Sequence, residues 1–460
     1  MTATVTLPEE EVPTLLETDI VVCGGGTTGP IAAIAAARQG KRVALIERYG
    51  ALGGNLTLGL NTKPSGALLG GLPREIWDLA RDMGAAGKDY VARLKHGSVG
   101  IASPGDPELM KLLLTRLCVE AGVQILFECF VSRPFLDGGT VAGVIVESKA
   151  GRQAVRAKVT IDCSADGDVA AAAGAPFVMG DGGDAPKMQP VSVYFSMRDV
   201  DIPAVVHWAE AHPEEVPDRA IPENAADYDY GLWLTGFNRM LREFQAESGI
   251  RLQRENITLK TTNGVMYVNA TRVIGVDALS PLEASAATVE CYRQIEAVSG
   301  FLIERVGGFE NAKIDRIAPY LGARETRHIQ GGYVLTLDDV TRGAAFEDSI
   351  AADASALDLH QVSGADVEFI DYPPYEIPYR CLVPRDVEQL LVAGRCISAD
   401  HAAHSRSRNM PACMATGQAA GIAAAIAVDS NRPVRMVDID RLQAALEDLG
   451  MPLRAADLDR

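Results

Sequence analysis

The polar segment Asp400–Asn409, DHAAHSRSRN, holds the densest group of chemically active side chains in the sequence. It contains two histidines, His401 and His404, and two arginines, Arg406 and Arg408. A histidine titrates near neutral pH and can move a proton in acid–base catalysis. An arginine can bind a carboxylate through two parallel hydrogen bonds. These residue types are those expected of a site that moves a proton and anchors an anion.

Two histidines three residues apart also raise the hypothesis of a metal site. The neighbouring sequence offers no third or fourth ligand, which a protein-bound metal normally requires. None of the eight cysteines forms a C-x-x-C pair, and most stand in apolar runs, where cysteine behaves as a small hydrophobe. We therefore expect no metal and no redox disulfide.

Three further arginines are candidate anchors for a substrate. Arg324 and Arg327 flank Glu325 in the segment LGARETR. They could orient a substrate carboxylate, or they could form ion pairs that bridge two domains, and the sequence leaves both hypotheses open. Arg380 follows Tyr379 at a presumed domain junction, where ligand sites are common.

A glycine-rich motif near the N-terminus points to a bound dinucleotide. Gly24–Gly29 reads G-G-G-T-T-G, follows a short apolar run and precedes an alanine-rich helical pattern. In this G-x-G-x-x-G pattern Gly24 permits a tight turn, Gly26 lets a pyrophosphate approach, and Gly29 lets the helix pack on the strand. The pyrophosphate then lies at the helix N-terminus. Glu47, 18 residues beyond Gly29, stands where a carboxylate meets a ribose hydroxyl.

The elements that must position these groups can be outlined from the patterns along the chain. Residues 19–47 predict a β-α-β unit, and helical patterns follow at 74–84 and 107–121. Alternating runs on either side of Asp137-Gly138-Gly139 predict an antiparallel meander. A late strand at 389–393 leads through a polar loop into a small-residue helix from Pro411, and this strand could rejoin the N-terminal sheet.

We predict an α/β fold of two domains, because 460 residues exceed what one core usually accommodates. A discontinuous, Rossmann-like dinucleotide-binding domain covers 19–190 and 379–460. A mixed α+β substrate domain, 191–378, is inserted into it, and residues 1–18 form a polar tail. The first boundary follows a Gly/Pro break, and the second follows a proline cluster.

Composition excludes several classes of partner. The formal net charge of −18 disfavours nucleic acid and anionic membrane surfaces, both of which would repel the chain. We find no uncharged apolar run of 18 residues, and the closest segment, 412–428, is so rich in Gly and Ala that it predicts a buried helix. We expect a cytoplasmic protein without a membrane span, and a homo-oligomer remains open.

Taken together, five motifs resemble the FAD-dependent oxidoreductase family. This family belongs to the glutathione-reductase-like superfamily and is distantly similar to fumarate reductase and succinate dehydrogenase flavoproteins. The resemblance extends over residues 19–428. The motifs that carry it are Gly24–Gly29, Leu52–Thr57 (LGGNLT), Asp162–Asp168 (DCSADGD), Leu321–Arg327 and Leu391–Gly421.

The resemblance implies that FAD lies extended across the first domain. The pyrophosphate would be held by Gly24, Gly26, Thr27, Thr28 and Gly29, with Glu47 on the adenosine ribose and Arg48 nearby. The pyrophosphate and flavin side would be followed by Gly54, Asn55 and Thr57. The adenine end would be lined by Val131, Ser164, Ala165 and Asp166.

The remaining implied contacts lie at the flavin end. Gly394 and Arg395 would sit at the ribityl chain, and the helix that starts at Met410 and Pro411 would direct its N-terminus at the pyrimidine edge. A helix N-terminus stabilises the negative charge of a reduced flavin. Two departures from the family stand out. Cys163-Ser164-Ala165 replaces the more usual Ala-Thr-Gly, and residues 51–63 hold no histidine for covalent attachment, so we expect non-covalent FAD.

Because only one dinucleotide motif is present, the sequence favours hydride transfer between FAD and a small polar substrate, with or without a carboxylate. By analogy with the family, His404 or His401 would be the acid/base, and an unidentified electron acceptor or donor would complete the cycle. The anchors would be Arg324, Arg327, Arg380, Arg406 and Arg408. Two alternatives are a flavin-dependent monooxygenase that uses O₂ and a non-catalytic flavin-fold binding protein similar to the prenyl-GTPase escort proteins.

Overall fold

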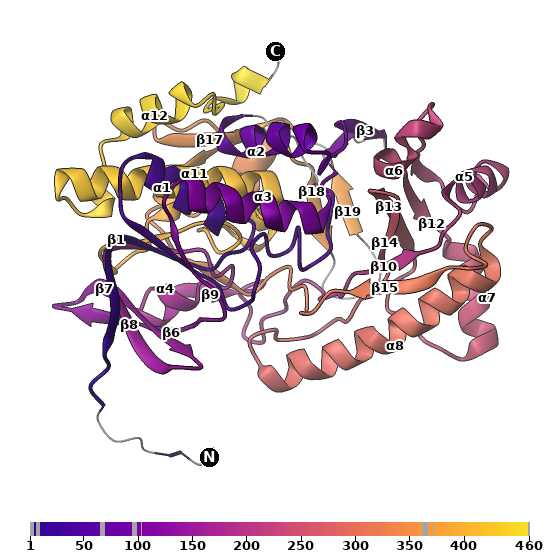
Figure 1. Cartoon of the computed structure of the whole chain (residues 1–460), viewed down its shortest axis with the longest axis horizontal. Coiled ribbons are helices and arrows are strands. Elements are labelled where there is room, and N and C mark those ends of the chain that lie inside the picture. Colours follow the sequence, from indigo (N-terminus) through magenta and orange to yellow (C-terminus); the bar gives the residue numbers. More distant parts are fainter. Residues whose placement is uncertain are drawn as a thin grey trace.

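The computed structural model describes residues 4–5, 10–64, 70–93, 99–102, 104–360, 367–370 and 372–458. The predicted polar tail, 1–18, lies partly outside these residues. A seven-stranded sheet and a six-stranded sheet form the two main bodies of β-structure. They lie at opposite ends of the molecule (Figure 1).

The seven-stranded sheet has the order β5-β2-β1-β8-β7-β6, and β21 pairs with the end of β8. β5, β2, β1, β8 and β21 run parallel, whereas β7 and β6 are antiparallel. The late strand thus rejoins the N-terminal sheet, as the sequence predicts, and the α/β fold class is confirmed. The strands are β1 (Thr14–Cys23), β2 (Val43–Ile46), β5 (Gln124–Leu126), β6 (Phe130–Asp137), β7 (Thr140–Ser148), β8 (Gly151–Asp162) and β21 (Leu390–Val392).

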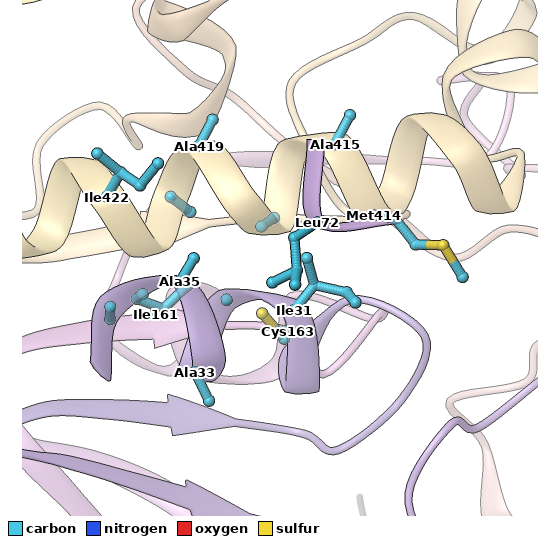
Figure 2. Close-up of a cluster of buried hydrophobic side chains, with 14 of the residues drawn as sticks. Ile31, Ala33, Ala35, Leu72, Ile161, Cys163, Met414, Ala415, Ala419 and Ile422 are labelled. Atoms are coloured by element: carbon cyan, nitrogen blue, oxygen red, sulfur yellow. The ribbon is translucent and has the colours of Figure 1, made fainter. Parts of the chain in front are cut away.

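Two helices with small side chains, α1 (Gly29–Arg38) and α11 (Met410–Ser430), pack against each other on this sheet (Figure 2). A Cβ at Gly417 would lie 2.7 Å from the Thr28 carbonyl oxygen, and one at Gly421 would collide with that of Ala32. The glycines of α11 therefore serve close helix packing. The other helices of this body are α2 (Gly71–Asp82), α3 (Pro107–Glu120), α4 (Asp168–Ala172) and α12 (Ile439–Asp448).

The six-stranded sheet is antiparallel, with the order β11-β12-β13-β14-β10-β15. Alternate residues point to opposite faces of a sheet. One face packs Leu259, Val268 and Phe195 against helices α5, α7 and α8. The elements are β10 (Phe195–Arg198), α5 (Ile202–Ala211), β11 (Asp218–Ala220), α6 (Tyr228–Gly231), β12 (Trp233–Gly236), α7 (Asn238–Ser248), β13 (Ile257–Thr262), β14 (Val265–Asn269), α8 (Pro281–Arg305) and β15 (Lys313–Ile317).

Short paired strands connect these bodies. Ile350, Tyr375 and Ile377 from this region pack in the core of α1 and α11, although they precede residue 379. The domain division at 191 and 379 stays a prediction. The connecting elements are β3 (Tyr90–Arg93), β4 (Val99–Ala102), β9 (Phe177–Met179), β16 (Arg327–Ile329), α9 (Leu337–Arg342), β17 (Ser349–Asp353), β18 (Leu357–His360), β19 (Val367–Ile370) and β20 (Tyr375–Pro378).

The polar segment before α11 is a helix, and the expectation of a loop there was wrong. Helix α10 spans His401–Ser407, and the carboxylate of Asp400 accepts a hydrogen bond from the Ala403 amide at 2.7 Å. An aspartate at this position satisfies one of the free N–H groups with which every helix begins. The helix fixes His401 and His404 one turn apart.

Helix α11 is long and apolar enough to cross a membrane, the one helix of the described chain that is. Its most apolar window is 94% buried inside the protein. This helix is therefore a core helix, as the sequence predicts for 412–428.

Candidate functional site

The three motif glycines occupy three different environments. Gly24 adopts φ +105°, and a Cβ there would lie 2.5 Å from the Cys163 carbonyl oxygen. A Cβ at Gly29 would collide with the Gly24 carbonyl, so the start of α1 packs directly on the turn. At Gly26, by contrast, no described atom lies within 4 Å of an added Cβ. The loop therefore leaves open space at the glycine beside which a pyrophosphate would pass.

Two helix N-termini accompany this open space. Within the described chain, neither Thr28 before α1 nor Asn409 before α11 caps its helix with its side chain. Free N–H groups at a helix start favour an anion. Gly394 adopts φ +85° at the end of β21, donates its N–H to Thr416 Oγ1 at 3.0 Å and packs against Thr28. The start of α1, the end of β21 and α11 are thus tied together.

Glu47 binds the glycine loop in this structure. Its carboxylate accepts hydrogen bonds from the amides of Gly25 at 2.6 Å and Tyr49 at 2.8 Å. Burial raises the pKa of Glu47, and the two amide bonds and Arg48 act in the opposite direction. Arg48 lies over the ring of Tyr49 at 4.8 Å, and Tyr49 stacks on Tyr320.

The loop after β2 lies against the glycine motif. A Cβ on Gly54 would lie 2.8 Å from the Gly26 Cα, so these two backbones are in contact. Thr57 is buried and donates its hydroxyl to the Leu52 carbonyl at 2.6 Å, which holds the loop in shape. Asn55 is exposed, and Thr27 donates its hydroxyl to the Gly53 carbonyl at 3.3 Å.

The turn after β8 joins the late segment Gly394-Arg395 through an ion pair. Asp166 accepts hydrogen bonds from Arg395 Nη2 at 2.5 Å and from the Thr326 hydroxyl at 2.7 Å. Burial would raise the pKa of Asp166, but Arg395 and Thr326 lower it overall. Ala165, before it, adopts φ +71°, a conformation that costs a residue with a Cβ free energy.

Other predicted contacts are peripheral to this pair. The Ser164 hydroxyl accepts the amide of Asp168 at 3.0 Å, and Val131 is a partly buried residue of β6. Met410 is buried at the start of α11, and Pro411 occupies its first turn.

Three histidines gather around the buried carboxylate of Glu325. Oε1 accepts hydrogen bonds from His401 Nδ1 at 2.7 Å and His328 Nε2 at 2.8 Å, and Oε2 accepts the Gln189 amide at 2.9 Å. His404 packs edge-on against His328, with 4.5 Å between the ring centroids. Sequence spacing could not reveal this cluster, because Glu325 and His401 are 76 residues apart.

The cluster divides the two predicted acid/base candidates. Burial lowers the pKa of His401, but the hydrogen bond and charge of Glu325 outweigh it and raise the pKa above its ordinary value. His401 is 22% exposed, and no described residue pairs with its Nε2. His404 is 1% exposed, and burial holds its pKa well below the ordinary value. His401 therefore has the free nitrogen and the charge support that proton transfer needs.

Both carboxylate oxygens of Glu325 accept hydrogen bonds from these donors. Burial would raise its pKa, but the hydrogen bonds from His328 and His401 lower it below the ordinary value. Candidate metal-ligand atoms of Glu325, His328 and His404 lie within 4.8 Å of one another. Since both carboxylate oxygens accept N–H donors, hydrogen bonding accounts for this arrangement, and the absence of a metal stays a prediction.

The five predicted arginine anchors fall into two groups. Arg408 donates to the Asp358 carboxylate at 3.0 Å and to Gln189 Oε1 at 3.4 Å, so it adjoins the histidine cluster through Gln189. Arg324 donates to the Pro190 carbonyl at 2.6 Å. These two arginines lie beside the residues that bind Glu325.

The structure places the other three arginines in different roles. Arg327 pairs with Asp168 at 2.8 Å, as the ion-pair hypothesis for the segment predicts. Arg380 forms a two-point pair with Asp348 and is half exposed. Arg406 is fully buried beneath the ring of Tyr375 and donates to the carbonyls of Ser355, Val340 and Pro373.

Comparison with known proteins places this geometry among flavoenzymes. The model of the FAD-dependent oxidoreductase family matches residues 19–446. Digeranylgeranylglycerophospholipid reductase 2 of Methanopyrus kandleri is 33% identical over 159 residues, which cover 33% of this chain and 38% of that protein. The match thus spans well under two thirds of the relative's length.

Two solved structures match most of this chain. The p-nitrophenol 4-monooxygenase of Pseudomonas putida DLL-E4 matches with a TM-score of 0.50 and 11% identity, over 96% of this chain and 89% of that one. A geranylgeranyl bacteriochlorophyll reductase-like protein of Thermoplasma acidophilum matches with a TM-score of 0.49 and 15% identity, over 96% and 90% of the two chains. Likeness at this identity concerns the fold alone.

Proposed function

Because this chain belongs to the FAD-dependent oxidoreductase family, we propose that it transfers a hydride between FAD and a small polar substrate that carries a carboxylate. The observation that carries the proposal is the Glu325–His401 pair, a buried carboxylate hydrogen-bonded at 2.7 Å to a partly exposed histidine. A carboxylate in this arrangement fixes the tautomer of the ring and leaves Nε2 free to take up or release a proton.

The residues of the first sheet fit FAD. The open space at Gly26 and the uncapped start of α1 support the proposal that the pyrophosphate lies beside Gly26, and the Gly54 backbone lies next to that glycine. Glu47 and Arg48 would serve the adenosine side, with Val131 and Ser164 at the adenine end. Arg395, held by Asp166, and the start of α11 would contact the flavin end. When bound, FAD supplies the two-electron acceptor or donor of the reaction.

His401 would manage the proton of the reaction. In the oxidative direction the substrate C–H bond breaks with its electron pair leaving as hydride, and Nε2 of His401 accepts the proton of the adjacent O–H or N–H. In the reductive direction the same nitrogen returns that proton. Glu325 stabilises the imidazolium that forms, because its charge raises the pKa of His401 against the effect of burial.

Arg408 and Arg324 would anchor the substrate carboxylate. Arg408 donates to Gln189 Oε1, and Arg324 donates to the carbonyl of Pro190. The amide of Gln189 in turn donates to the Glu325 carboxylate. An anchored carboxylate holds the reacting carbon in a fixed place, which is worth several orders of magnitude in rate for well-oriented groups. Arg327, Arg380 and Arg406 are left out of this role, since they bind Asp168, Asp348 and backbone carbonyls outside the segment that contacts Glu325.

An anaerobic screen tests the proposal. Small hydroxy and amino acids are mixed with the oxidised flavoprotein, and bleaching of the oxidised flavin band is followed by stopped flow. Unsaturated acids are mixed with the chemically reduced flavoprotein, and the return of that band is followed. We expect one class of acid to reduce the flavin, and the His401→Asn variant to lose roughly 100-fold or more in the rate of reduction. His212→Asn is the matched control, since the His212 ring contacts, among the described residues, the carbonyl and ring of Trp208 in α5. An unchanged rate in His401→Asn would remove its role.

The same screen separates the other functions. Rapid flavin reduction by NAD(P)H with substrate hydroxylation would indicate a monooxygenase. Reduction of an isoprenoid lipid in place of a small acid would bring the substrate closer to that of the Methanopyrus kandleri reductase. Reoxidation by O₂, compared with a quinone or dye, would identify the electron acceptor. We propose the cytoplasm as the location.

A further inference from the structure

The face of the six-stranded sheet that lies opposite α5, α7 and α8 carries polar side chains among aromatic ones. Leu259 on β13 faces the core, so Lys260 and Thr262 face the other side. The hydroxyl of Thr262 is hydrogen-bonded at 2.8 Å to that of Thr62, which comes from the loop after the glycine motif. Lys260 therefore faces the body that carries the dinucleotide motif.

Further polar groups share this face by strand register. Asn269 on β14 is paired with Thr258, two residues from Lys260. Arg254 Nη1 donates to Asn269 Oδ1 at 2.8 Å. On β10, Phe195 faces the core, so its neighbour Tyr194 lies on the polar side.

Four cationic side chains lie close enough to one carboxylate for their charges to interact with it. The four cations are all buried or partly buried: Arg254, Lys260, Arg324 and Arg408. The negative charge of Asp358 raises the pKa of Arg254, Lys260 and Arg324 against the effect of burial. Asp358 already accepts hydrogen bonds from Arg408 at 3.0 Å and from His360 Nε2 at 3.2 Å. Positive charge therefore exceeds negative charge here by about three units when the four cations are protonated.

Burial and the neighbouring cations both lower the pKa values of this group. Burial, reinforced by Arg254 and opposed by Asp358, lowers the pKa of Lys260 to about 8. Burial, with Arg324 and Arg272, lowers the pKa of Arg254 to about 10. At neutral pH both side chains remain protonated despite mutual repulsion.

Several donors of this cluster have no acceptor among the described residues. Lys260 has no hydrogen-bond or ion-pair partner there. Gln189 is 1% exposed, and its Nε2 is unsatisfied, as is Nε of Arg408. Buried donors without partners cost about 1–3 kcal/mol each, and more for charged groups. A ligand with oxygen acceptors would satisfy this set of donors.

We propose that Lys260 and Arg254 bind a second anionic group of the substrate, so that the substrate carries at least two negatively charged groups. This inference rests on the proposed function, in which Arg408 and Arg324 bind the first carboxylate of the substrate. The second group is a carboxylate or a phosphate, since both present oxygen acceptors to a cation.

Anion binding to the oxidised holoenzyme tests the proposal. Succinate, citrate and inorganic phosphate are titrated by calorimetry, beside acetate as a single charge and succinamide as a neutral analogue. We expect at least one multiply charged anion to bind, and to bind more tightly than acetate or succinamide. Preference for citrate and succinate over phosphate would identify a second carboxylate, and the reverse order a phosphate. Equal binding of succinamide, or no binding by any anion, would overturn the proposal.

Variants locate the site. Lys260→Met should weaken the binding of the preferred anion by roughly 10- to 100-fold, whereas Lys260→Arg should retain most of it. Lys313→Met on β15 of the same sheet is the matched control, because Lys313 is 65% exposed and pairs only with Asp199. Equal affinity in Lys260→Met and wild type would overturn the proposal, and the anion series on wild type decides it even if Lys260→Met does not fold.

The outcomes separate this proposal from the proposed function. If multiply charged anions bind through Lys260 but no acid reduces the flavin, the anion site stands and the hydride-transfer proposal fails. If monocarboxylates reduce the flavin as fast as dicarboxylates, hydride transfer stands and the second anion site fails.

Discussion

The carboxylate of Glu325 accepts a 2.7 Å hydrogen bond from Nδ1 of His401. The two residues come from different parts of the chain, a loop before β16 and the first turn of α10. The carboxylate is buried and the histidine is partly exposed. The negative charge of Glu325 therefore lies in the interior, and Nε2 of His401 lies on the more exposed side of the pair. This arrangement makes the pH dependence of the reaction a direct test of the site.

The variant Glu325→Gln should slow flavin reduction and shift its pH profile. As a base, His401 must be neutral, so the rate of substrate oxidation rises as pH rises through its pKa. Glu325 holds that pKa above 6.5, so removing its charge should move the rising limb to lower pH while the maximal rate falls roughly 100-fold. Stopped-flow reduction across pH 5–9 measures both, and Glu325→Asp should restore part of the shift. A lower rate with an unmoved limb would mean that Glu325 is only structural.

Two alanine substitutions in the glycine motif should have opposite effects. Gly26→Ala places a methyl group in open space, so the apoprotein should keep its Tm while FAD binding weakens. Gly29→Ala forces a collision with the Gly24 carbonyl and should cost about 1–3 kcal/mol of unfolding free energy. Bound flavin from the absorbance spectrum and Tm of the apoprotein separate the two. Full flavin occupancy and unchanged affinity in Gly26→Ala would contradict the predicted path of the pyrophosphate.

Replacing Ala165 by glycine should stabilise the protein. Ala165 holds φ +71°, a region that costs a residue with a side chain about 1–2 kcal/mol, and glycine avoids this cost at some expense in the entropy of the unfolded chain. We expect Ala165→Gly to raise the unfolding free energy by up to about 1 kcal/mol in urea denaturation. Ala173→Gly, at the right-handed C-terminus of α4, is the control and should destabilise.

Arg406 and Arg380 should affect stability rather than substrate binding. Arg406→Met leaves three carbonyls without their donor in a fully buried site, so we expect a loss of about 3 kcal/mol. Arg380→Gln breaks a half-exposed ion pair with Asp348 and should cost about 1 kcal/mol or less. In both folded variants KM should match wild type. A KM raised tenfold in Arg380→Gln would return this arginine to the substrate site.

Local patterns in the sequence predicted the first body well. The structure contains the glycine motif, the helices near 74–84 and 107–121, the meander and the return of the late strand to the first sheet. All but the last depend on residues that are neighbours in the sequence, and the late strand pairs with the parallel sheet. The segment after Asp400 was harder. Its polar residues suggested a loop, but the cap at Asp400 and two alanines produce a helix.

Sequence reasoning missed the partners that only the fold brings together. In the sequence Glu325 stands between two arginines, whereas in the fold it binds two histidines and an amide. Lys260 gave a weak signal, a charged residue in the strand ITLKTT, which alternation places opposite the core. Arg254 and Asp358 belong to no motif. Their association with Lys260 depends on the register of β13 and β14 and on the contacts of β18, which the sequence does not reveal.

The packing of α1 against α11 has a consequence for the making of the chain. The alanine-rich side of α1 is synthesised early, but the helix that covers it begins at Met410. At a translation rate of about 5–20 residues per second, the alanine-rich side of α1 stays uncovered for about 20–80 s before α11 is synthesised. During this interval a growing chain exposes apolar surface beside an unfinished sheet, a state in which nascent chains are prone to aggregate.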